Sequence, residues 1–261
     1  MFSRPKVISI LNKFRLFNLL RWVFFWAHSF DKRKLAFYRQ FVSPGDLCYD
    51  IGANIGQEIE LFLRLGAKVV AVEPQEECFI FLKNIYRNNP NVVLINKALD
   101  SNSGLRKEMF ISEANALSSL SLDFVEHAGK TAWKGYTWNG RQAVMTDTLD
   151  ALIALHGVPV FCKIDVEGYE HNVIQGLKRL IPVISFESTP LTRESTFKVL
   201  DHLSGLGELK INWLLDPTFS KGPIKMNNPE WTQNIGEVKK MLSVETDFYG
   251  DVFVKMFERK K

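Results

Sequence analysis

The stretch D-I-G-A-N-I-G, residues 50–56, decides how this chain folds. It directly follows an apolar run, 47–49, and directly precedes a helical pattern, so it turns a strand into a helix. Its two glycines allow a sharp turn and a close approach to a ligand, because glycine has no Cβ. The next strand, 68–72, is followed directly by Glu73. In strand–helix–strand nucleotide sites, a carboxylate at this position accepts hydrogen bonds from the ribose hydroxyls. The stretch therefore predicts a nucleoside-bearing cofactor.

The spacing of the two glycines separates two classes of cofactor. Dinucleotide sites use G-x-G-x-x-G to pack a helix N-terminus against a pyrophosphate. Here the glycines are four residues apart, and Asn54 takes the place of the middle glycine. Such a loop leaves room for a methionyl tail and offers polar partners for its ammonium and carboxylate groups, so we predict S-adenosylmethionine (SAM), with an ordinary tight turn as the alternative. The residues predicted to bind SAM are Asp50, Gly52, Asn54, Gly56 and Glu73.

The length and composition are those of a globular protein. With 261 residues, the chain is long enough for one sizeable domain with additions or for two small domains. Hydrophobic residues make up 46% of it and charged residues 24%, which argues against intrinsic disorder. Cys48, Cys78 and Cys162 have no metal-ligand spacing, so we expect reduced thiols in a cytoplasmic protein.

Positive charge is concentrated in residues 1–45, which we predict to form a basic, apolar helical segment ahead of a domain at 46–261. Nine Lys or Arg residues oppose Asp31 there, a balance of +8, and the remaining residues sum to −4. An acidic domain argues against a nucleic-acid partner. The longest apolar run of the segment is six residues, 22–27, whereas a membrane-spanning helix needs about twenty.

Two interpretations of this segment stay open. Its basic and aromatic residues suit peripheral contact of residues 1–30 with an anionic surface such as the inner face of a membrane. A helical lid or a dimer surface would have the same composition. The oligomeric state does not follow from the sequence.

From residue 46 onward, strand patterns alternate with helical patterns. The predicted strands are 47–51, 69–72, 92–96, 161–166 and 183–187, and the predicted helices are 57–65, 77–88, 171–180 and 193–206. The strands are almost continuously apolar, as in parallel strands covered by helices on both faces. A final strand pair, 208–215 and 247–257, would add an antiparallel strand. The fold class is therefore α/β, with a mostly parallel sheet, a terminal antiparallel strand and an N-terminal helical segment.

Two segments interrupt this alternation. The first, 100–146, holds an aromatic loop between two further predicted strands, 106–111 and 142–145. The second, 216–246, begins with an irregular stretch, 216–237. Long loops in a compact domain are commonly functional covers. We therefore expect both segments to cover the site.

The fourth strand carries ionisable residues at alternate positions, Lys163, Asp165 and Glu167, which place them on one face of the strand. A lysine in an apolar strand is costly to bury without a partner, and Asp165 and Glu187 are the nearest candidates. The cluster either fixes the strands by a buried ion pair or orients and deprotonates a substrate. The predicted catalytic residues are Lys163, Asp165 and Glu187.

Several motifs follow one another along about residues 45–190. They are Asp50-Ile-Gly-Ala-Asn-Ile-Gly56, Val72-Glu-Pro74, Asn96-Lys-Ala-Leu99, Ser118-Ser-Leu120, Thr148-Leu-Asp150, Lys163-Ile-Asp-Val-Glu-Gly168 with Glu170, and Phe186-Glu187. Their order resembles the FkbM-type family of SAM-dependent methyltransferases. The resemblance implies a Rossmann-like class I methyltransferase fold and a cofactor site that also includes Ala98, Leu99 and Asp165. Many relatives have a histidine where this chain has Tyr169, so a base at that position would be another group here.

The resemblance also implies transfer to a hydroxyl, usually of a sugar or a polyketide. Methyl transfer needs the acceptor oxygen in line behind the methyl group and a base or polarising group within hydrogen-bond reach. Asp165 or Glu187 could be the base, or the two could hold a divalent cation. The sequence does not choose between these, and it assigns no metal ligand.

We expect a SAM-dependent O-methyltransferase that acts on a saccharide or glycan precursor. The alternatives are an O-methyltransferase of a small secondary metabolite and a catalytically silent partner-binding protein. Trp133, Tyr136 and Trp138 could stack on a sugar ring or anchor their loop to the core. The residues after Asp165, Val-Glu-Gly-Tyr, differ from the Asn/Asp-Pro-Pro-aromatic loop of nucleic-acid amino methyltransferases, so no nucleic-acid substrate is expected.

Overall fold

The computed structural model describes residues 32–131, 133–215, 224, 226, 230–244 and 248–259. The segment predicted to contact a membrane, 1–30, lies outside these residues, so this contact stays a prediction. Helix α3 (Lys32–Tyr38) packs through Phe37 and Tyr38 into the core of the main sheet. The division of the chain at residue 45 stays a prediction as well. Within the described residues, no helix is both long and apolar enough to cross a bilayer.

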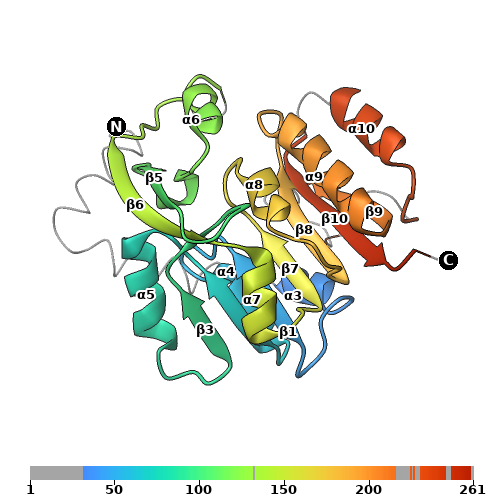
Figure 1. Cartoon of the computed structure of the whole chain (residues 1–261), viewed down its shortest axis with the longest axis horizontal. Helices are drawn as coiled ribbons and strands as arrows, with labels where there is room; N and C mark the ends of the chain where they lie inside the picture. The colour runs from blue at the N-terminus through green and yellow to red at the C-terminus, as the bar shows by residue number, and fades with distance from the viewer. Residues whose placement is uncertain are drawn as a thin grey trace.

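A seven-stranded sheet in the order β3-β2-β1-β7-β8-β10-β9 forms the centre of the molecule (Figure 1). Its strands are β1 (Leu47–Ile51), β2 (Lys68–Val72), β3 (Val92–Ile95), β7 (Phe161–Ile164), β8 (Val183–Ser188), β9 (Glu208–Leu215) and β10 (Gly250–Phe257). The first five in the order pair in parallel, and β10 is antiparallel to β8 and β9. The predicted α/β fold is confirmed. The strand order reverses between β1 and β7, which is where open α/β sheets bind their ligands.

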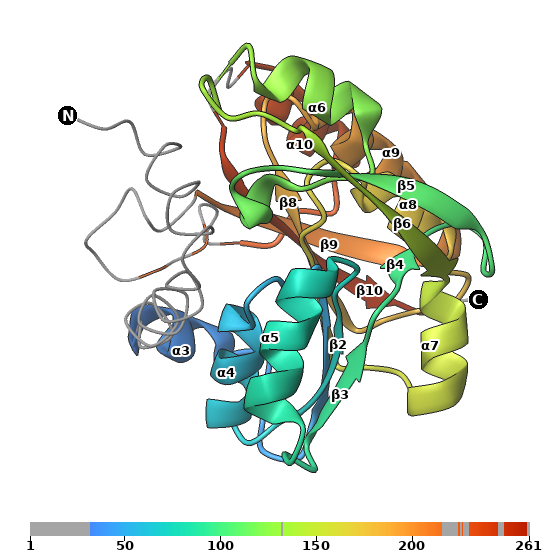
Figure 2. The same ribbon diagram turned by 90° about the vertical axis from the view of Figure 1, so that its left-hand side faces the viewer.

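Helices cover both faces of this sheet because its strands are apolar on both faces. One face carries α3, α4 (Gln57–Arg64) and α5 (Glu76–Tyr86); the other carries α7 (Leu149–His156), α8 (Glu170–Gln175) and α9 (Arg193–Leu206), with α10 (Ile235–Val244) against α9. Figure 2 shows α4 and α5 on one side of the strands and α7 on the other. In β7, Phe161 packs on the first face and Ile164 on the second, and both are fully buried.

A small sheet, β4-β6-β5, lies beside the carboxyl ends of β1 and β2. It consists of β4 (Ala98–Leu99), β5 (Arg106–Ile111) and β6 (Gly140–Asp147). Both strands predicted in this part of the chain are present. The residues between them were predicted as a loop, but they contain a short 3-10 helix (Asn115–Leu117) and α6 (Leu122–Ala128).

Local capping explains where the helix predictions were wrong. The side chain of Ser121 accepts a hydrogen bond from Phe124 N at the start of α6, and Thr148 accepts one from Ala151 N at the start of α7. These caps satisfy free amide groups at a helix start, and neither helix was predicted. The helix predicted at 171–180 stops at Gln175, where Gly176 follows.

Candidate active site

Two pockets meet at the carboxyl ends of β1, β2, β7 and β8. The first, which we call the cofactor pocket, lies between the loop after β1, the end of β2 and the small sheet. Six of the residues predicted to bind the cofactor line it: Gly52, Asn54, Glu73, Ala98, Leu99 and Asp165. Asp50 and Gly56 are not among the lining residues. Further lining residues, which the sequence did not assign to the cofactor, include Met109, Asn115, Ala116, Ser118 and Leu120.

Gly52 is required by the protein's own backbone. Its φ is 87°, and an added Cβ would lie 1.8 Å from the carbonyl oxygen of Asp165. The loop after β1 therefore passes directly against the end of β7, and Asp165 N donates to Ile51 O at 2.8 Å. The close approach of Gly52 to a ligand stays a prediction, and the structure adds a close approach to the residue that follows β7. Gly56, with φ 85°, is instead the residue that begins α4.

Glu73 is held in one orientation by backbone amides. Asn54 N donates to its Oε2 and Gln75 N to its Oε1, each at 2.7 Å. The side chain of Asn96 also donates to the carbonyl oxygen of Glu73 at 2.9 Å. A carboxylate has about four acceptor positions, so this arrangement is compatible with hydrogen bonds from ribose hydroxyls. The buried carboxylate joins the loops after β1 and β2.

Asp50 lies beneath the loop after β1 rather than on the wall of the pocket. It is 2% exposed, and its Oδ2 has no hydrogen-bond partner among the described residues. Burial raises the pKa of Asp50 well above its usual range, and the nearby Glu58 and Asp165 carboxylates raise it further. In the sheet Asp50 is opposite Lys163 of β7. Its surroundings therefore favour the neutral form of the Asp50 carboxyl group behind the loop.

The second pocket, which we call the acidic cavity, has a volume of about 480 Å³. Its charged lining residues are Lys34, Glu58, Lys163, Asp165, Glu167, Glu187 and Asp251. Its apolar and aromatic lining residues are Phe37, Tyr38, Trp133, Leu214, Ile224 and Tyr249. Asp165 and Glu167 line both pockets. A group bound in the cofactor pocket and a molecule in the acidic cavity would therefore meet at these two carboxylates.

Lys163 has the carboxylate partner that its burial requires, but its shortest ion pair is one that the sequence did not indicate. Its Nζ lies 2.5 Å from Asp251 Oδ1 and 3.3 Å from Asp165 Oδ2. Burial alone would lower the pKa of Lys163, but these two carboxylates raise it well above its usual range. The other predicted partner, Glu187, forms no ion pair with Lys163 within the described residues. Asp251 is opposite Glu187 across β10 and β8, a pairing between segments far apart in the sequence.

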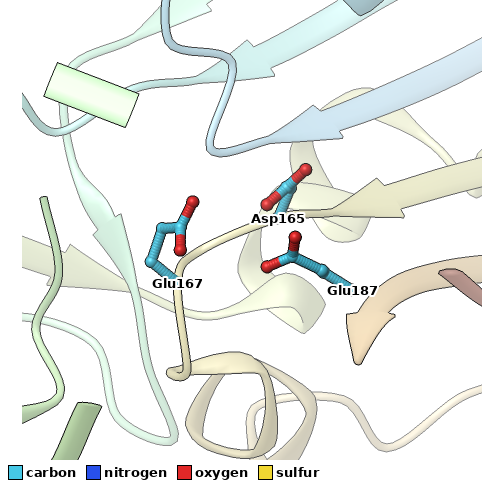
Figure 3. A group of neighbouring side chains, drawn as sticks. All are labelled: Asp165, Glu167 and Glu187. Atoms are coloured by element: carbon cyan, nitrogen blue, oxygen red, sulfur yellow. The ribbon is translucent and has the colours of Figure 1, made fainter. Parts of the chain in front are cut away.

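Three carboxylates gather beside this lysine: Asp165, Glu167 and Glu187. One oxygen from each lies within 4.8 Å of the others, and Figure 3 shows the carboxyl groups pointing toward one another. Burial raises the pKa of Glu167 well above its usual range, and repulsion from Glu187 and Asp165 adds to this. Burial and repulsion from Asp165 likewise raise the pKa of Glu187. Negative charge here is thus costly without a positive partner.

Glu167 reaches this cluster for a different reason from the predicted one. Strand alternation placed it on the face of Lys163 and Asp165, but β7 ends at Ile164. The chain instead turns through a left-handed conformation at Glu167, with φ 54°. Gly168 follows with φ 86°, where a Cβ would meet that of Phe124 at 2.9 Å. The turn, and not the strand, directs the carboxyl group of Glu167 toward the cluster.

Tyr169 lies on the cofactor side of the site. It lines the cofactor pocket and is not among the residues that line the acidic cavity. Its hydroxyl accepts a hydrogen bond from Lys107 Nζ at 2.6 Å and donates one to Asp100 Oδ2 at 3.2 Å. Lys107 and Asp100 also form an ion pair with each other. This network, which the sequence did not indicate, holds Tyr169 against the cofactor pocket.

The aromatic residues of the loop after β5 divide between the two predicted roles. Trp138 is 8% exposed, its Nε1 donates to Leu117 O at 2.6 Å, and its ring packs edge-on to Phe124. Trp133 lines the acidic cavity, edge-on to Tyr249 with ring centroids 6.0 Å apart. Tyr136 and Trp133 both pack against the same small apolar cluster as Trp138, and the ring centroid of Trp133 lies 5.5 Å from that of Phe124. Trp138 thus anchors the loop, and Trp133 offers an aromatic surface to the cavity.

Comparison with protein families gives one match. The profile of the methyltransferase FkbM domain matches residues 50–208, which include the loop after β1, Glu73 and the three clustered carboxylates. The match covers more than half of the chain. A comparison with curated proteins gave no match.

Several solved methyltransferase structures are distantly similar. A precorrin-6y C5,15-methyltransferase from Geobacter metallireducens is 11% identical, with 85% of this chain and 87% of that chain covered and a TM-score of 0.41. A SAM-dependent O-methyltransferase from Thermotoga maritima is 12% identical, with coverages of 88% and 67% and a TM-score of 0.39. Fibrillarin from Aeropyrum pernix, with natively bound SAM, is 11% identical, with coverages of 87% and 76% and a TM-score of 0.42.

Proposed function

The chain belongs to the FkbM methyltransferase family and is a SAM-dependent methyltransferase, and we propose that it transfers the methyl group to a hydroxyl of a saccharide or glycan precursor. The observation that carries this proposal is the shared wall of the two pockets. Asp165 and Glu167 border both the cofactor pocket and the acidic cavity. The acidic cavity is therefore the proposed acceptor site.

The lining of the acidic cavity supports a saccharide as the acceptor. Its volume, about 480 Å³, lies within the range of about 300–1,000 Å³ that is usual for ligand pockets. Carboxylates accept hydrogen bonds from several hydroxyl groups at once. The rings of Trp133 and Tyr249 offer apolar faces on which a sugar ring can pack. A polyhydroxylated ring matches both kinds of surface.

In the proposed reaction, the acceptor oxygen attacks the methyl carbon of SAM. The carbon–oxygen bond forms as the carbon–sulfur bond breaks, and the electron pair of that bond stays on sulfur in S-adenosylhomocysteine. The hydroxyl proton passes to a carboxylate of the cluster. Alignment of the two reactants accounts for much of the rate, and a positioned base typically contributes about 10²- to 10⁴-fold.

Asp165 and Glu187 are the proposed proton acceptors, and Lys163 is the residue that positions Asp165. Asp165 borders both pockets, and Lys163 holds its Oδ2 at 3.3 Å. Glu187 borders the acidic cavity only. Because Asp165 borders both pockets, it is the favoured proton acceptor of the two.

We further propose that residues 1–30 bring the enzyme to an anionic membrane face on the cytoplasmic side. Their basic and aromatic composition suits such a surface. The described helix that follows them in the sequence, α3, contributes Lys34, Phe37 and Tyr38 to the acidic cavity. A lipid-linked glycan precursor in that membrane would thus be close to the acceptor site.

Transfer of isotope-labelled methyl from SAM tests the acceptor class. The full-length protein is incubated with cell extracts of the source organism, which are then separated into glycans, lipid-linked saccharides and small metabolites. Label in the first two fractions is the expected result. Label in the small-metabolite fraction would instead identify an O-methyltransferase of secondary metabolism, and no label in any fraction would contradict a hydroxyl acceptor.

A further inference from the structure

The carboxylates at the wall between the two pockets form a candidate ion site. We propose that Asp165, Glu167 and Glu187 hold one divalent cation. The site follows from the geometry of these residues alone. Only the role of the cation in catalysis rests on the proposed function.

The first observation is that three separate parts of the fold bring one oxygen each to a common place. Asp165 directly follows β7, Glu167 lies in the left-handed turn after it, and Glu187 belongs to β8. One oxygen from each lies within 4.8 Å of the others, and the three carboxyl groups point toward one another (Figure 3). Oxygens that share an ion at about 2.0–2.6 Å lie within such a distance of one another. The arrangement therefore fits a common ligand.

The second observation is that two oxygens of the cluster lack a partner. Glu167 Oε2 and Glu187 Oε2 are both shielded from solvent, and neither has a hydrogen-bond partner within the described residues. Buried carboxylates are normally hydrogen-bonded, paired with a cation or bound to a metal. Because both groups face the cluster, a ligand bound there would satisfy the two oxygens together.

The neighbouring lysine does not supply the missing positive charge. Lys163 Nζ is engaged by Asp251 at 2.5 Å and by Asp165 at 3.3 Å, and within the described residues it forms no ion pair with Glu167 or Glu187. Lys34, the other ammonium of the acidic cavity, is paired with Glu58 at 2.9 Å. This part of the cavity thus has four carboxylates, Asp165, Glu167, Glu187 and Asp251, and one ammonium, that of Lys163. A divalent cation offsets most of this excess of negative charge.

The chemistry of the ligands indicates the class of ion. All three are carboxylates, with no histidine or cysteine, which favours Mg²⁺, Mn²⁺ or Ca²⁺. Such ions take six or more ligands, so positions remain for water and for oxygens of a molecule in the acidic cavity. A cation there would lower the pKa of an acceptor hydroxyl. The bonds that form and break remain those of the proposed reaction, and the hydroxyl proton still passes to a carboxylate.

Binding of Mn²⁺ to the full-length protein, with S-adenosylhomocysteine present, tests the proposal without reference to turnover. The electron paramagnetic resonance signal of free Mn²⁺ reports the bound fraction. We expect one bound ion per chain, displaced by excess Mg²⁺ or Ca²⁺. Glu167→Gln and Glu187→Gln should each weaken binding by roughly tenfold or more, since even outer-shell changes cost about 10- to 100-fold.

The matched control is Glu208→Gln, at an exposed position on β9, which should bind Mn²⁺ as the wild-type protein does. Thermal unfolding of each variant shows whether it is folded. Absence of bound Mn²⁺ at millimolar concentration in the wild-type protein would overturn the proposal and indicate that the two glutamates share a proton instead. Wild-type affinity in both folded variants would also overturn it.

A separate measurement distinguishes this proposal from the proposed function. If the wild-type protein binds no ion, yet methylates a saccharide in the presence of a chelator, the cation site fails and the function stands. If it binds one ion that both substitutions remove, yet methylates no hydroxyl, the cation site stands and the function fails.

Discussion

The cofactor pocket and the acidic cavity share a wall but are built in different ways. In the cofactor pocket, the carboxylate of Glu73 is held by two backbone amides. The acidic cavity collects residues from α3, α4, β7, β8 and β10, and three of its carboxylate oxygens have no hydrogen-bond partner among the described residues. The first pocket is thus organised by the fold itself, whereas the second is arranged for a ligand that brings positive charge or hydrogen-bond donors.

The largest effect should come from the contact that joins the two pockets. Gly52→Ala places a Cβ 1.8 Å from the Asp165 carbonyl oxygen, at a backbone angle that disfavours any side chain. We expect a loss of about 4 kcal/mol or more in the free energy of unfolding, as for other severe backbone clashes. Chemical denaturation measures it.

Gly104→Ala is the matched control for this substitution. Gly104 also has a left-handed φ, of 78°, but a Cβ there would meet nothing within 4 Å among the described residues. Its cost should be only about 1–2 kcal/mol, the usual cost of the left-handed conformation. Equal costs for the two substitutions would show that the close approach of β1 and β7 does not constrain the fold.

Two tryptophans of one loop sharpen the comparison further. Trp138→Ala removes a buried ring and should lower the free energy of unfolding by about 3–5 kcal/mol. Trp133→Ala removes a cavity wall and should chiefly raise the KM for the acceptor, by about 1 kcal/mol or roughly fivefold. Thermal unfolding and steady-state kinetics measure the two effects. The division of roles would be wrong if Trp133→Ala destabilised the protein as much as Trp138→Ala.

The proposed contact of Glu73 with the ribose predicts an effect confined to the cofactor pocket. Glu73→Ala should weaken SAM binding by about 1.5–3 kcal/mol, the scale of a hydrogen bond to a charged group. Calorimetry with SAM and with S-adenosylhomocysteine measures it. NAD should not bind either protein, because the loop after β1 lacks the glycine spacing for a pyrophosphate. Tighter binding of NAD than of SAM would contradict the cofactor assignment.

The smallest effect per residue concerns the basic side chains of residues 1–30. Each basic side chain near an anionic surface contributes about 1 kcal/mol, and salt screens this attraction. The full-length protein should therefore pellet with anionic vesicles at low salt, and less so at high salt or without residues 1–30. Equal pelleting with neutral and anionic vesicles would exclude the membrane contact. Loss of fold stability on truncation would favour the helical lid.

The two pockets also differ in how far the sequence predicts them. The loop after β1 and Glu73 were predicted to lie together, because strand ends and turn residues are local signals that also fix their position in a parallel sheet. Ala98 and Leu99 were predicted only through the family resemblance. Asp251 was missed, because its place beside Lys163 depends on the pairing of β10 with β8, which no local signal specifies. Glu167 was placed correctly for the wrong reason, since a left-handed turn rather than strand alternation directs it.

The fold shows the same division between local and long-range information. The parallel strands and α9 were predicted closely because their apolar patterns are strong and continuous. The helices α6, α7 and α10 were missed, the first two although Ser121 and Thr148 were available as N-caps. The Tyr169–Lys107–Asp100 network had no local signal, because it joins residues far apart in the sequence.

The most direct test of the account is the effect of Asp165→Asn and Glu187→Gln on labelled methyl transfer to the acceptor fraction, measured together with the affinity for S-adenosylhomocysteine. Both residues are proposed to act on the acceptor. We therefore expect turnover to fall by roughly 10²- to 10⁴-fold, as for a removed base, while the affinity for S-adenosylhomocysteine changes far less. Wild-type turnover in both variants, with the fold intact, would contradict the account and make the cluster a structural ion pair.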